Sequence, residues 1–390
     1  MCSSDLLHYE FPKDLTLDEV REIVRDNPNF YIGERDGYIV VNYLVAGKDT
    51  HPPVVDRKTA IMRELRGLIF DQDGRVASRR LHKFFNLGER EDVALIDVSK
   101  PHVVLEKLDG SMITPFMVDG VLRWGTKMGL TEVADQVEKF IEFDAIRASN
   151  YKRFALTMIE QDCTPIFEWC SRKQRIVIDY PEDRLVLIAV RDNETGEYVN
   201  FDRLMADYPD IPRVGELAPI ADLEKFTQEL RKREDIEGVV IRFADGHMVK
   251  VKTDTYVALH RAKSELESER NVVRLILEDK VDDLLPLLIG EDYVAMIEYM
   301  DKVNLSVRVH VDLVNAELDY IRENGISRKD FALSNKLDPS IRAFVFKHWD
   351  DMCTRDSVVD FVLKHLGSNK SYEKCHTIIV DRWREVKIDE

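Results

Sequence analysis

The sequence predicts an α+β protein, in which a domain built on antiparallel sheets is followed by an all-helical domain. Three observations lead to this prediction. Short β-rich runs separated by turn residues fill the first part of the chain. Beyond about residue 265 the apolar residues change to the 3.6-residue spacing of helices. The 390 residues are also enough for two ordinary cores. We therefore place the two domains at residues 1–265 and 266–390.

The first domain contains runs that are rich in β-branched and aromatic residues, as strands are. These runs cover residues 38–45, 67–78, 102–127 and 184–199. Asp73-Gly74 and Asp119-Gly120 interrupt two of them, and such pairs favour tight hairpin turns. One helix is expected after Thr131, a suitable N-cap, because the apolar residues that follow share one face. Hairpins joined in this way predict antiparallel sheets.

The second domain shows helical spacing and helix-end signals. An apolar stripe from Val307 to Ile321 stops at Asn324-Gly325, a typical helix C-cap. Ser327 and Asp338-Pro339 are suitable starts for two further helices. Residues 357–366 predict another helix, which ends before a glycine. Helices are therefore expected throughout this domain.

Composition limits the class of protein. Hydrophobic residues make up 44% and charged residues 33% of the chain, as in ordinary soluble proteins. No apolar run reaches the roughly 18 residues that a membrane span needs, and the five cysteines are scattered without a metal-binding or disulfide pattern. The net charge of −17 argues against a broad nucleic-acid-binding surface, although cations can still gather in a cleft. We expect a cytoplasmic monomer with no membrane segment.

Charged residues in apolar β-runs indicate a site. The stretch EKLDGSMI contains Lys107, and a lysine nucleophile needs a neutral amine, which nearby cations, a metal ion or burial favour. Glu168, Glu237, Lys250 and Lys252 all lie in or beside strongly apolar strands. Each alone is more simply a solvated strand residue. Together they predict one shared site, because glutamate and lysine are rarely buried without partners.

The order of these residues resembles a known superfamily, the covalent nucleotidyltransferases, which includes ATP-dependent ligases and mRNA capping enzymes. The residues that match its motifs I, III, IV and V are Lys107-x-Asp109-Gly110, Glu168, Glu237 and Lys250-x-Lys252. The closer resemblance is to the phage-type RNA ligase 1 family, over about residues 60 to 285. Its further hallmarks occur here as Glu64-Leu65-Arg66-Gly67, Lys83-Phe84-Phe85-Asn86 and the stretch RDNETGEY at 191–198.

The resemblance implies a nucleotidyltransferase domain with ATP-dependent RNA ligase activity. Lys107 would attack the α-phosphorus of ATP and form lysyl–AMP. The AMP would then pass to a 5′-phosphate RNA end, and a 3′-hydroxyl would displace it. ATP and Mg²⁺ are the implied cofactors, with Mn²⁺ as an alternative. RNA is the implied partner, either single-stranded or nicked in a tRNA loop, in a bacterial or phage-infected cytoplasm.

The resemblance also assigns roles to individual residues. The implied catalytic residues are Lys107, Glu237, Lys250 and Lys252. Those implied to contact the nucleotide are Arg66, Lys83, Lys107, Gly110, Lys127, Glu168, Lys250 and Lys252. The implied metal ligands are Glu237, Asp282 and Asp283. The contact to adenine is expected from the strand at residues 184–190, without a particular residue assigned.

Two alternatives from different classes remain open. The first is a DNA ligase or a capping guanylyltransferase, but those enzymes carry an OB-fold after motif V, where this chain has helical spacing. Ser111 also follows the motif I glycine, where DNA ligases tend to have Glu-Arg. The second alternative is a protein that binds RNA ends without catalysis, which would have lost a motif lysine or glutamate. Neither kind of residue is missing from the motifs.

Overall fold

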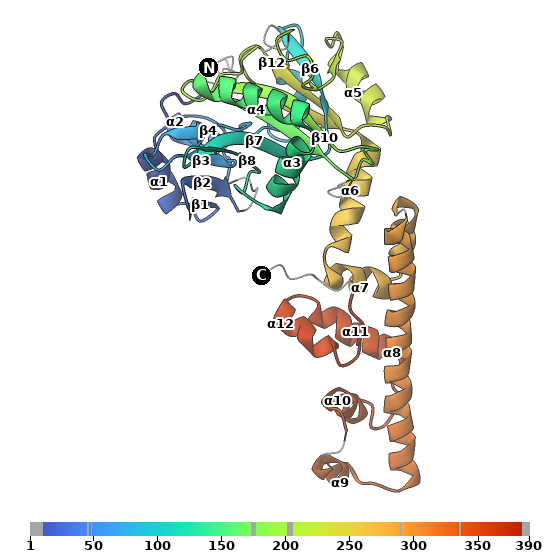
Figure 1. Cartoon of the computed structure of the whole chain (residues 1–390). Coiled ribbons are helices and arrows are strands. Elements are labelled where there is room, and N and C mark those ends of the chain that lie inside the picture. The colour runs from blue at the N-terminus through green and yellow to red at the C-terminus, as the bar shows by residue number, and fades with distance from the viewer. Residues whose placement is uncertain are drawn as a thin grey trace. The chain divides into compact units, whose positions relative to one another are not determined.

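The computed structural model describes residues 11–44, 47, 49–172, 177–200, 206–288, 290–334 and 337–383, except the side chains of residues 283, 291 and 369. Two compact units divide the chain, residues 1–257 and 258–390 (Figure 1). The predicted fold class is confirmed: the first unit is built on antiparallel sheets, and the described elements of the second are helical. The functional division with a boundary at residues 265–266 stays a prediction.

The described residues of the first unit form three sheets. Their strands are β1 (Phe30–Arg35), β2 (Tyr38–Tyr43), β3 (Leu68–Phe70), β4 (Val76–Ser78), β5 (Phe85–Asn86), β6 (His102–Lys107), β7 (Ser111–Val118), β8 (Val121–Gly125), β9 (Cys163–Cys170), β10 (Arg184–Asp192), β11 (Glu216–Leu217), β12 (Gly238–Phe243) and β13 (Met248–Lys252). The strand orders are β1-β2-β3-β4, β10-β9-β7-β8 and β11-β6-β12-β13-β5. Among these neighbours, β13 and β5 are parallel and the other pairs are antiparallel.

Local sequence signals explain several of these elements. Asp119 and Gly120 both have positive φ, 49° and 78°, which suits the tight hairpin between β7 and β8. Asp73-Gly74 lies between β3 and β4, as predicted. Thr131 is the N-cap residue of α3 (Glu132–Glu142), but its side chain makes no capping hydrogen bond. Its hydroxyl lies 3.3 Å from that of Thr126 instead, so the predicted cap contact is wrong although the helix is right.

Helices cover the outer faces of the sheets. The helices that begin in the first unit are α1 (Leu17–Arg25), α2 (Arg57–Glu64), α3, α4 (Ala145–Glu160), α5 (Leu223–Arg231) and α6 (Asp254–Leu266). Helices α3 and α4 pack on the β10-β9-β7-β8 sheet (Figure 1), and α5 packs on the five-stranded sheet. The opposite faces of these two sheets meet through an apolar cluster that contains Leu105, Leu108 and Val186. Charged residues on these inner faces can therefore come close together.

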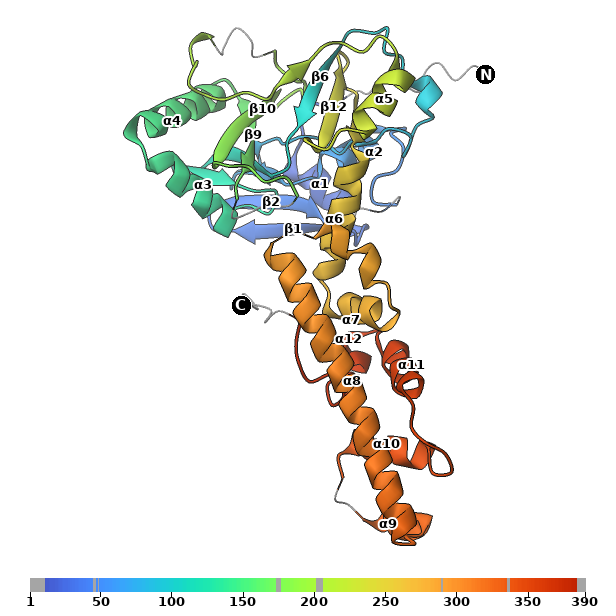
Figure 2. The same cartoon turned by 90° about the vertical axis from the view of Figure 1, so that its right-hand side faces the viewer.

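The second unit is arranged along one long helix, α8 (Glu291–Glu323) (Figure 2). Its other helices are α7 (Glu269–Leu277), α9 (Arg328–Leu333), α10 (Pro339–Lys347), α11 (Arg355–His365) and α12 (Asn369–Tyr372). The predicted stripe from Val307 to Ile321 is buried or partly buried on α8. Ser327 and Asp338 cap α9 and α10, as predicted. Within the described ranges, every helix is too short or too polar to cross a membrane.

Candidate nucleotide-binding site

The register of three neighbouring strands brings Lys107, Glu237 and Lys252 together. Gly238, the first residue of β12, pairs with Lys107 of β6 on one side and with Lys252 of β13 on the other. Glu237 immediately precedes it, and its side chain is only 3% exposed. One carboxylate oxygen, Oε2, accepts from Lys107 Nζ at 2.8 Å, and Oε1 accepts from Lys252 Nζ at 2.9 Å. The site predicted from separate motifs is therefore contiguous at these three residues.

The backbone at Gly238 makes this approach sterically achievable. Its φ is +155°, and a Cβ there would lie 2.0 Å from the carbonyl oxygen of Val251. A larger residue would push β12 away from β13 and separate Glu237 from Lys252. Gly238 is thus a structural requirement of the site that the sequence analysis did not identify.

Glu168 approaches from the opposite sheet. Its neighbours on β9, Phe167 and Trp169, pack in the core beneath α3 and α4, so Glu168 projects from the other face. Burial raises the pKa of Glu168 to about 7, while the charge of Lys107 opposes that rise and the charge of Glu237 adds to it. Near neutral pH, both the protonated and the ionised form of this carboxyl are therefore populated.

Lys250 lies on the same face of β13 as Lys252, two residues earlier. Burial lowers the pKa of Lys250 to about 7, and the nearby cations Lys83, Lys107 and Arg66 act in the same direction. The protein holds this ammonium group where the loss of water and the nearby cations both disfavour its charge. A bound polyanion would reverse that effect, so the surroundings of Lys250 suit phosphate groups.

Three more residues that were predicted to contact the nucleotide, Arg66, Lys83 and Lys127, meet at an unpredicted residue, Tyr43. Lys83 Nζ lies 5.1 Å and Lys127 Nζ 5.5 Å from the centre of its ring, and the Arg66 side chain hydrogen-bonds to Tyr43. Burial raises the pKa of Tyr43, but these three cations outweigh burial and the resulting pKa is lowered. Sequence reasoning missed Tyr43 because it ends an ordinary apolar strand and carries no motif signal.

Gly110 fits its position because nothing larger would. A Cβ on Gly110 would lie 2.2 Å from the carbonyl oxygen of Trp169, so the turn after Lys107 packs directly on β9. The predicted contact of Gly110 with a nucleotide stays a prediction. The observed packing is already a sufficient reason for glycine here, because it brings the Lys107 strand against the strand of Glu168.

The motif I aspartate, Asp109, connects three segments of the chain through hydrogen bonds. It is 3% exposed, and its carboxylate accepts from the backbone N–H groups of Val177 and Ile178, at 2.6 and 2.7 Å. It also accepts from the Tyr256 hydroxyl at 2.7 Å. The Tyr256 ring lies 4.6 Å from Lys252 Nζ, so Tyr256 connects the Asp109 turn to the motif V lysines. Sequence reasoning missed this tyrosine as well.

The predicted metal ligands remain untested. Glu237 has an ion pair at each of its oxygens. Asp282 is exposed in a single helical turn, Val281–Asp283, of the second unit, and the side chain of Asp283 lies outside the described residues. In the described parts of the chain, no group of three or more His, Cys, Asp or Glu residues is arranged to hold a metal.

A cavity of about 1970 Å³ lies beside the predicted residues but does not contain them. Its lining includes Val103, Leu105 and Arg242, which belong to the face of the five-stranded sheet that carries the lysines. Lys107, Glu237 and Lys252 are not part of the lining. The large cavity and the cluster of charges are thus neighbouring features of one sheet face.

Comparison with known proteins identifies the family. A family model described as RNA ligase matches residues 64–256. A candidate RNA ligase of Thermovibrio ammonificans is 30% identical over 283 residues, which cover 70% of this chain and 71% of that protein. The chain belongs to the RNA ligase family. The predicted family, and with it the prediction of a ligase enzyme that acts on RNA, is confirmed.

Other similar proteins cover smaller shares or are more distant. RNA ligase 1 of bacteriophage TS2126 is 28% identical over 244 residues, 59% of this chain and 59% of the relative. A solved archaeal ATP-dependent RNA ligase aligns with a TM-score of 0.43 at 15% identity, over 65% of this chain and 68% of its own. A candidate ATP-dependent DNA ligase of Aquifex aeolicus also has a TM-score of 0.43 at 15% identity, with coverages of 72% and 69%.

Proposed function

We propose that this RNA ligase family member uses ATP to join 5′-phosphate and 3′-hydroxyl RNA ends through a lysyl–AMP at Lys107. The observation that supports this most directly is the Lys107–Glu237–Lys252 cluster, in which one buried carboxylate holds the lysine amine at 2.8 Å. The three steps are the transfer of AMP to Lys107, its transfer to the RNA 5′-phosphate, and its release by the RNA 3′-hydroxyl. Each is an in-line displacement at phosphorus, for which positioning and charge neutralisation matter most.

Glu237 is suited to prepare the nucleophile. An ammonium group has no lone pair, so Lys107 has to lose a proton before it attacks. Glu237 Oε2 lies at hydrogen-bonding distance from Lys107 Nζ and can accept that proton. Lys252 holds the other oxygen of the same carboxylate and fixes its orientation. In the proposal, Lys252 and Lys250 then stabilise the negative charge around the α-phosphorus.

We propose that a second group of cations neutralises the leaving group. Pyrophosphate carries several negative charges, and Arg66, Lys83 and Lys127 gather around Tyr43 with their side chains close to one ring. We assign the β- and γ-phosphates to this group. Mg²⁺ would add neutralising charge through phosphate oxygens, because the described residues do not supply a complete ligand set.

The inner sheet faces suggest where the nucleoside binds. Glu168, with its pKa near 7, can accept a hydrogen bond from a ribose hydroxyl when ionised and donate one when protonated. The strand predicted to contact adenine contains no aromatic residue, and its Val186 and Ile188 pack beside Leu105. We therefore propose aliphatic contacts to the base in place of an aromatic stack.

The proposal also covers the class of RNA substrate. Family membership supports RNA, and the helical second unit supports a ligase of this kind over enzymes that carry an OB-fold after motif V. We propose repair of single-stranded RNA or of a tRNA broken in its anticodon loop, in a bacterial or phage-infected cytoplasm, by a monomer. A DNA ligase and a capping guanylyltransferase are the competing enzymes, and a silent RNA-end-binding protein is the competing non-enzyme.

The test is covalent labelling with [α-³²P]ATP and Mg²⁺, followed by the same assay on Lys107→Ala. The wild-type protein should become labelled and should join or circularise single-stranded 5′-phosphate RNA. Lys107→Ala should lose at least about 10³-fold of both activities, because no other side chain can form the adduct. Lys100→Ala, an exposed lysine just before β6, is the matched control and should behave as wild type.

The competing functions give different results in the same assays. Labelling by [α-³²P]GTP in place of ATP would indicate a capping enzyme. Sealing of nicked duplex DNA without joining of RNA would indicate a DNA ligase. A wild-type protein that binds RNA ends and forms no covalent adduct would indicate the silent binding protein. An adduct that persists in Lys107→Ala would overturn the assignment of the nucleophile.

A further inference from the structure

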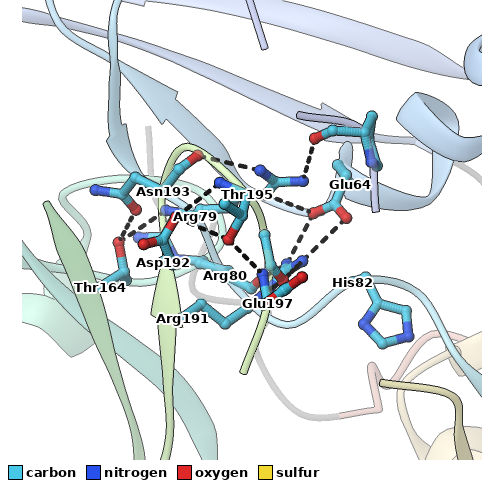
Figure 3. A network of polar contacts seen from close by, with 12 residues as sticks. Glu64, Arg79, Arg80, His82, Thr164, Arg191, Asp192, Asn193, Thr195 and Glu197 are labelled. Atoms are coloured by element: carbon cyan, nitrogen blue, oxygen red, sulfur yellow. Dashed lines mark hydrogen bonds and ion pairs between the residues drawn. The ribbon is translucent and has the colours of Figure 1, made fainter. Parts of the chain in front are cut away.

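A fully buried ion network lies in the same unit as the charged cluster of the site (Figure 3). Its centre is Glu64, the last residue of α2, whose side chain is 0% exposed. Both Glu64 oxygens accept from the Arg191 guanidinium, at 2.8 and 3.1 Å, and Oε2 also accepts from Arg79 Nε at 3.3 Å. We call Glu64, Arg79 and Arg191 the Glu64 network. It contains the glutamate of the ELRG stretch and the arginine that begins RDNETGEY.

The network is held from several sides. Arg191 also donates to the carbonyl oxygens of Gly196 and Arg80, and its guanidinium lies near the rings of Phe11 and Tyr198, 4.8 and 4.9 Å from their centres. A planar guanidinium can make such bonds in several fixed directions at once, which an ammonium cannot do. The position of Arg191 is therefore set by the Glu64 carboxylate, by two backbone carbonyls and by the two rings.

Arg79 extends the network across the unit. It donates to the carbonyl oxygens of Asn193, at 3.1 Å, and of Pro12, at 2.8 Å. Its backbone N–H donates to the Thr164 hydroxyl at 2.9 Å. Thr164 lies on β9, four residues before Glu168, and pairs with Arg191 of β10. The network is therefore attached to the sheet that carries Glu168.

On its other side the network continues into the predicted phosphate contacts. The Glu64 carbonyl oxygen accepts from the backbone N–H of Arg66 at 2.6 Å. The carbonyl of the residue before Glu64 accepts from the backbone N–H of Lys83 at 2.7 Å. His82, next to Lys83, is bonded to the Tyr198 hydroxyl at 2.9 Å. The backbones of Arg66 and Lys83 are thus hydrogen-bonded to Glu64 and to the residue before it.

We propose that the Glu64 network is a positioning device for the first chemical step. It sets the distance of Arg66 and Lys83 from the sheet that carries Glu168, and so aligns the β- and γ-phosphates of ATP for attack by Lys107. This inference rests on the proposed function. The later joining step uses RNA–adenylate, which has no β- or γ-phosphate. Changes in the network should therefore impair lysyl–AMP formation selectively and spare the joining of pre-adenylylated RNA.

The test variant is Arg191→Lys, which keeps the charge beside Glu64 and removes the fixed directions of the guanidinium bonds. The ATP concentration for half-maximal lysyl–AMP formation should rise at least about ten-fold, since small misplacements of positioning groups have large kinetic effects. Joining of pre-adenylylated RNA by the same protein should stay within about three-fold of wild type. Arg79→Lys should shift the two assays in the same unequal way.

A matched destabilised control separates positioning from stability. Met158→Ala lies on α4, in the same unit as Arg191, and its side chain is buried in the apolar core between α4 and the β10-β9-β7-β8 sheet. It should lower the melting temperature and leave the ATP dependence unchanged. An unchanged ATP dependence in Arg191→Lys, or an equal fall of both steps that Met158→Ala reproduces, would overturn the inference. A wild-type protein that forms no lysyl–AMP would instead overturn the proposed function.

Discussion

Two groups of buried charges in the first unit differ in how fully their charged groups are hydrogen-bonded. In the Glu64 network, one carboxylate accepts from two guanidinium groups, which also donate to backbone carbonyls. In the candidate nucleotide-binding site, Glu237 forms ion pairs with Lys107 and Lys252, while Lys250 is surrounded by further cations. Burial opposes the charge of Glu64, but its arginine partners lower the pKa of Glu64 to about 2. The pKa of Lys250 is lowered to about 7, which favours its uncharged form.

This difference separates a structural role from a ligand-binding role. A buried charge with a full set of partners gains from staying where it is, and the fold depends on it. A buried charge without enough counter-charge costs stability until a ligand supplies that charge. Both groups come from residues that the family resemblance identifies, so sequence similarity alone does not distinguish them. The electrostatic surroundings do.

The largest effect on stability should come from breaking the Glu64 network. Glu64→Gln removes the buried carboxylate that Arg79 and Arg191 share and should lower the free energy of unfolding by about 3–5 kcal/mol. Lys250→Met removes a crowded cation and should leave that free energy unchanged or raise it at pH 7, although lysyl–AMP formation falls. Urea unfolding at pH 7 measures both.

The pH dependence of stability gives these predictions a sign. Glu64 has a lowered pKa in the folded protein, so its contribution is present above pH 4.5 and is lost as the pH falls towards 2. Lys250 also has a lowered pKa, but it is a base, so its destabilising effect is full below about pH 7 and fades as the pH rises towards 10.5. If Lys250→Met were as destabilising as Glu64→Gln, the contrast between the two groups would be wrong.

The core of the site was predictable because strand pairing is regular. Lys107, Glu237 and Lys252 lie at or beside the ends of three apolar runs, and an antiparallel register that pairs Gly238 with both lysines brings them together. The family motifs indicated the same residues. Several strands, helix α3 and the helix starts at Ser327 and Asp338 also carried local signals in turn residues and caps. The expectation of one helix in the first domain was wrong, because α1, α2, α4 and α5 also lie there.

The remainder depended on contacts between segments far apart in the chain. Tyr43 gathers three cations from separate loops, and Tyr256 reaches Asp109 across 147 positions. The local sequence around each tyrosine is the same as that expected around an aromatic residue of the core. Glu64 and Arg191 were recognised only as parts of family stretches, because a buried ion pair between residues 127 positions apart leaves no local pattern. Their structural role required the fold.

Proton uptake on nucleotide binding tests whether the crowded cations face the phosphates. Because Lys250 has a pKa of about 7, a bound triphosphate should raise that pKa, and about half a proton per nucleotide should be taken up by Lys250 at pH 7. Calorimetry with the non-hydrolysable analogue α,β-methylene ATP, in buffers of different ionisation enthalpy, measures this uptake. Lys250→Arg keeps the charge at all working pH values and should remove this contribution.

The outcomes of that measurement are distinct. Glu168, with a pKa also near 7, should contribute to any uptake that remains in Lys250→Arg. Uptake that is equal in wild type and Lys250→Arg would mean that Lys250 does not sense the phosphates. The proposed α-phosphate contact would then be wrong, whereas the inference on the Glu64 network would be unaffected.

The smallest expected effect is that of Tyr43→Phe, and it separates two roles of one residue. The ring stays in place for Lys83 and Lys127, so the packing of these cations should persist and the melting temperature should change little. The lost hydroxyl is the group that Arg66 bonds, at a cost of about 1 kcal/mol. The ATP concentration for half-maximal lysyl–AMP formation should rise a few-fold, whereas joining of pre-adenylylated RNA should not change.

Tyr43→Leu, which also removes the ring, should have the larger effect on ATP use, since cation–ring contacts are lost too. Equal effects of the two variants would assign the role of Tyr43 to its hydroxyl alone, and no effect of either would remove Tyr43 from the phosphate-binding group.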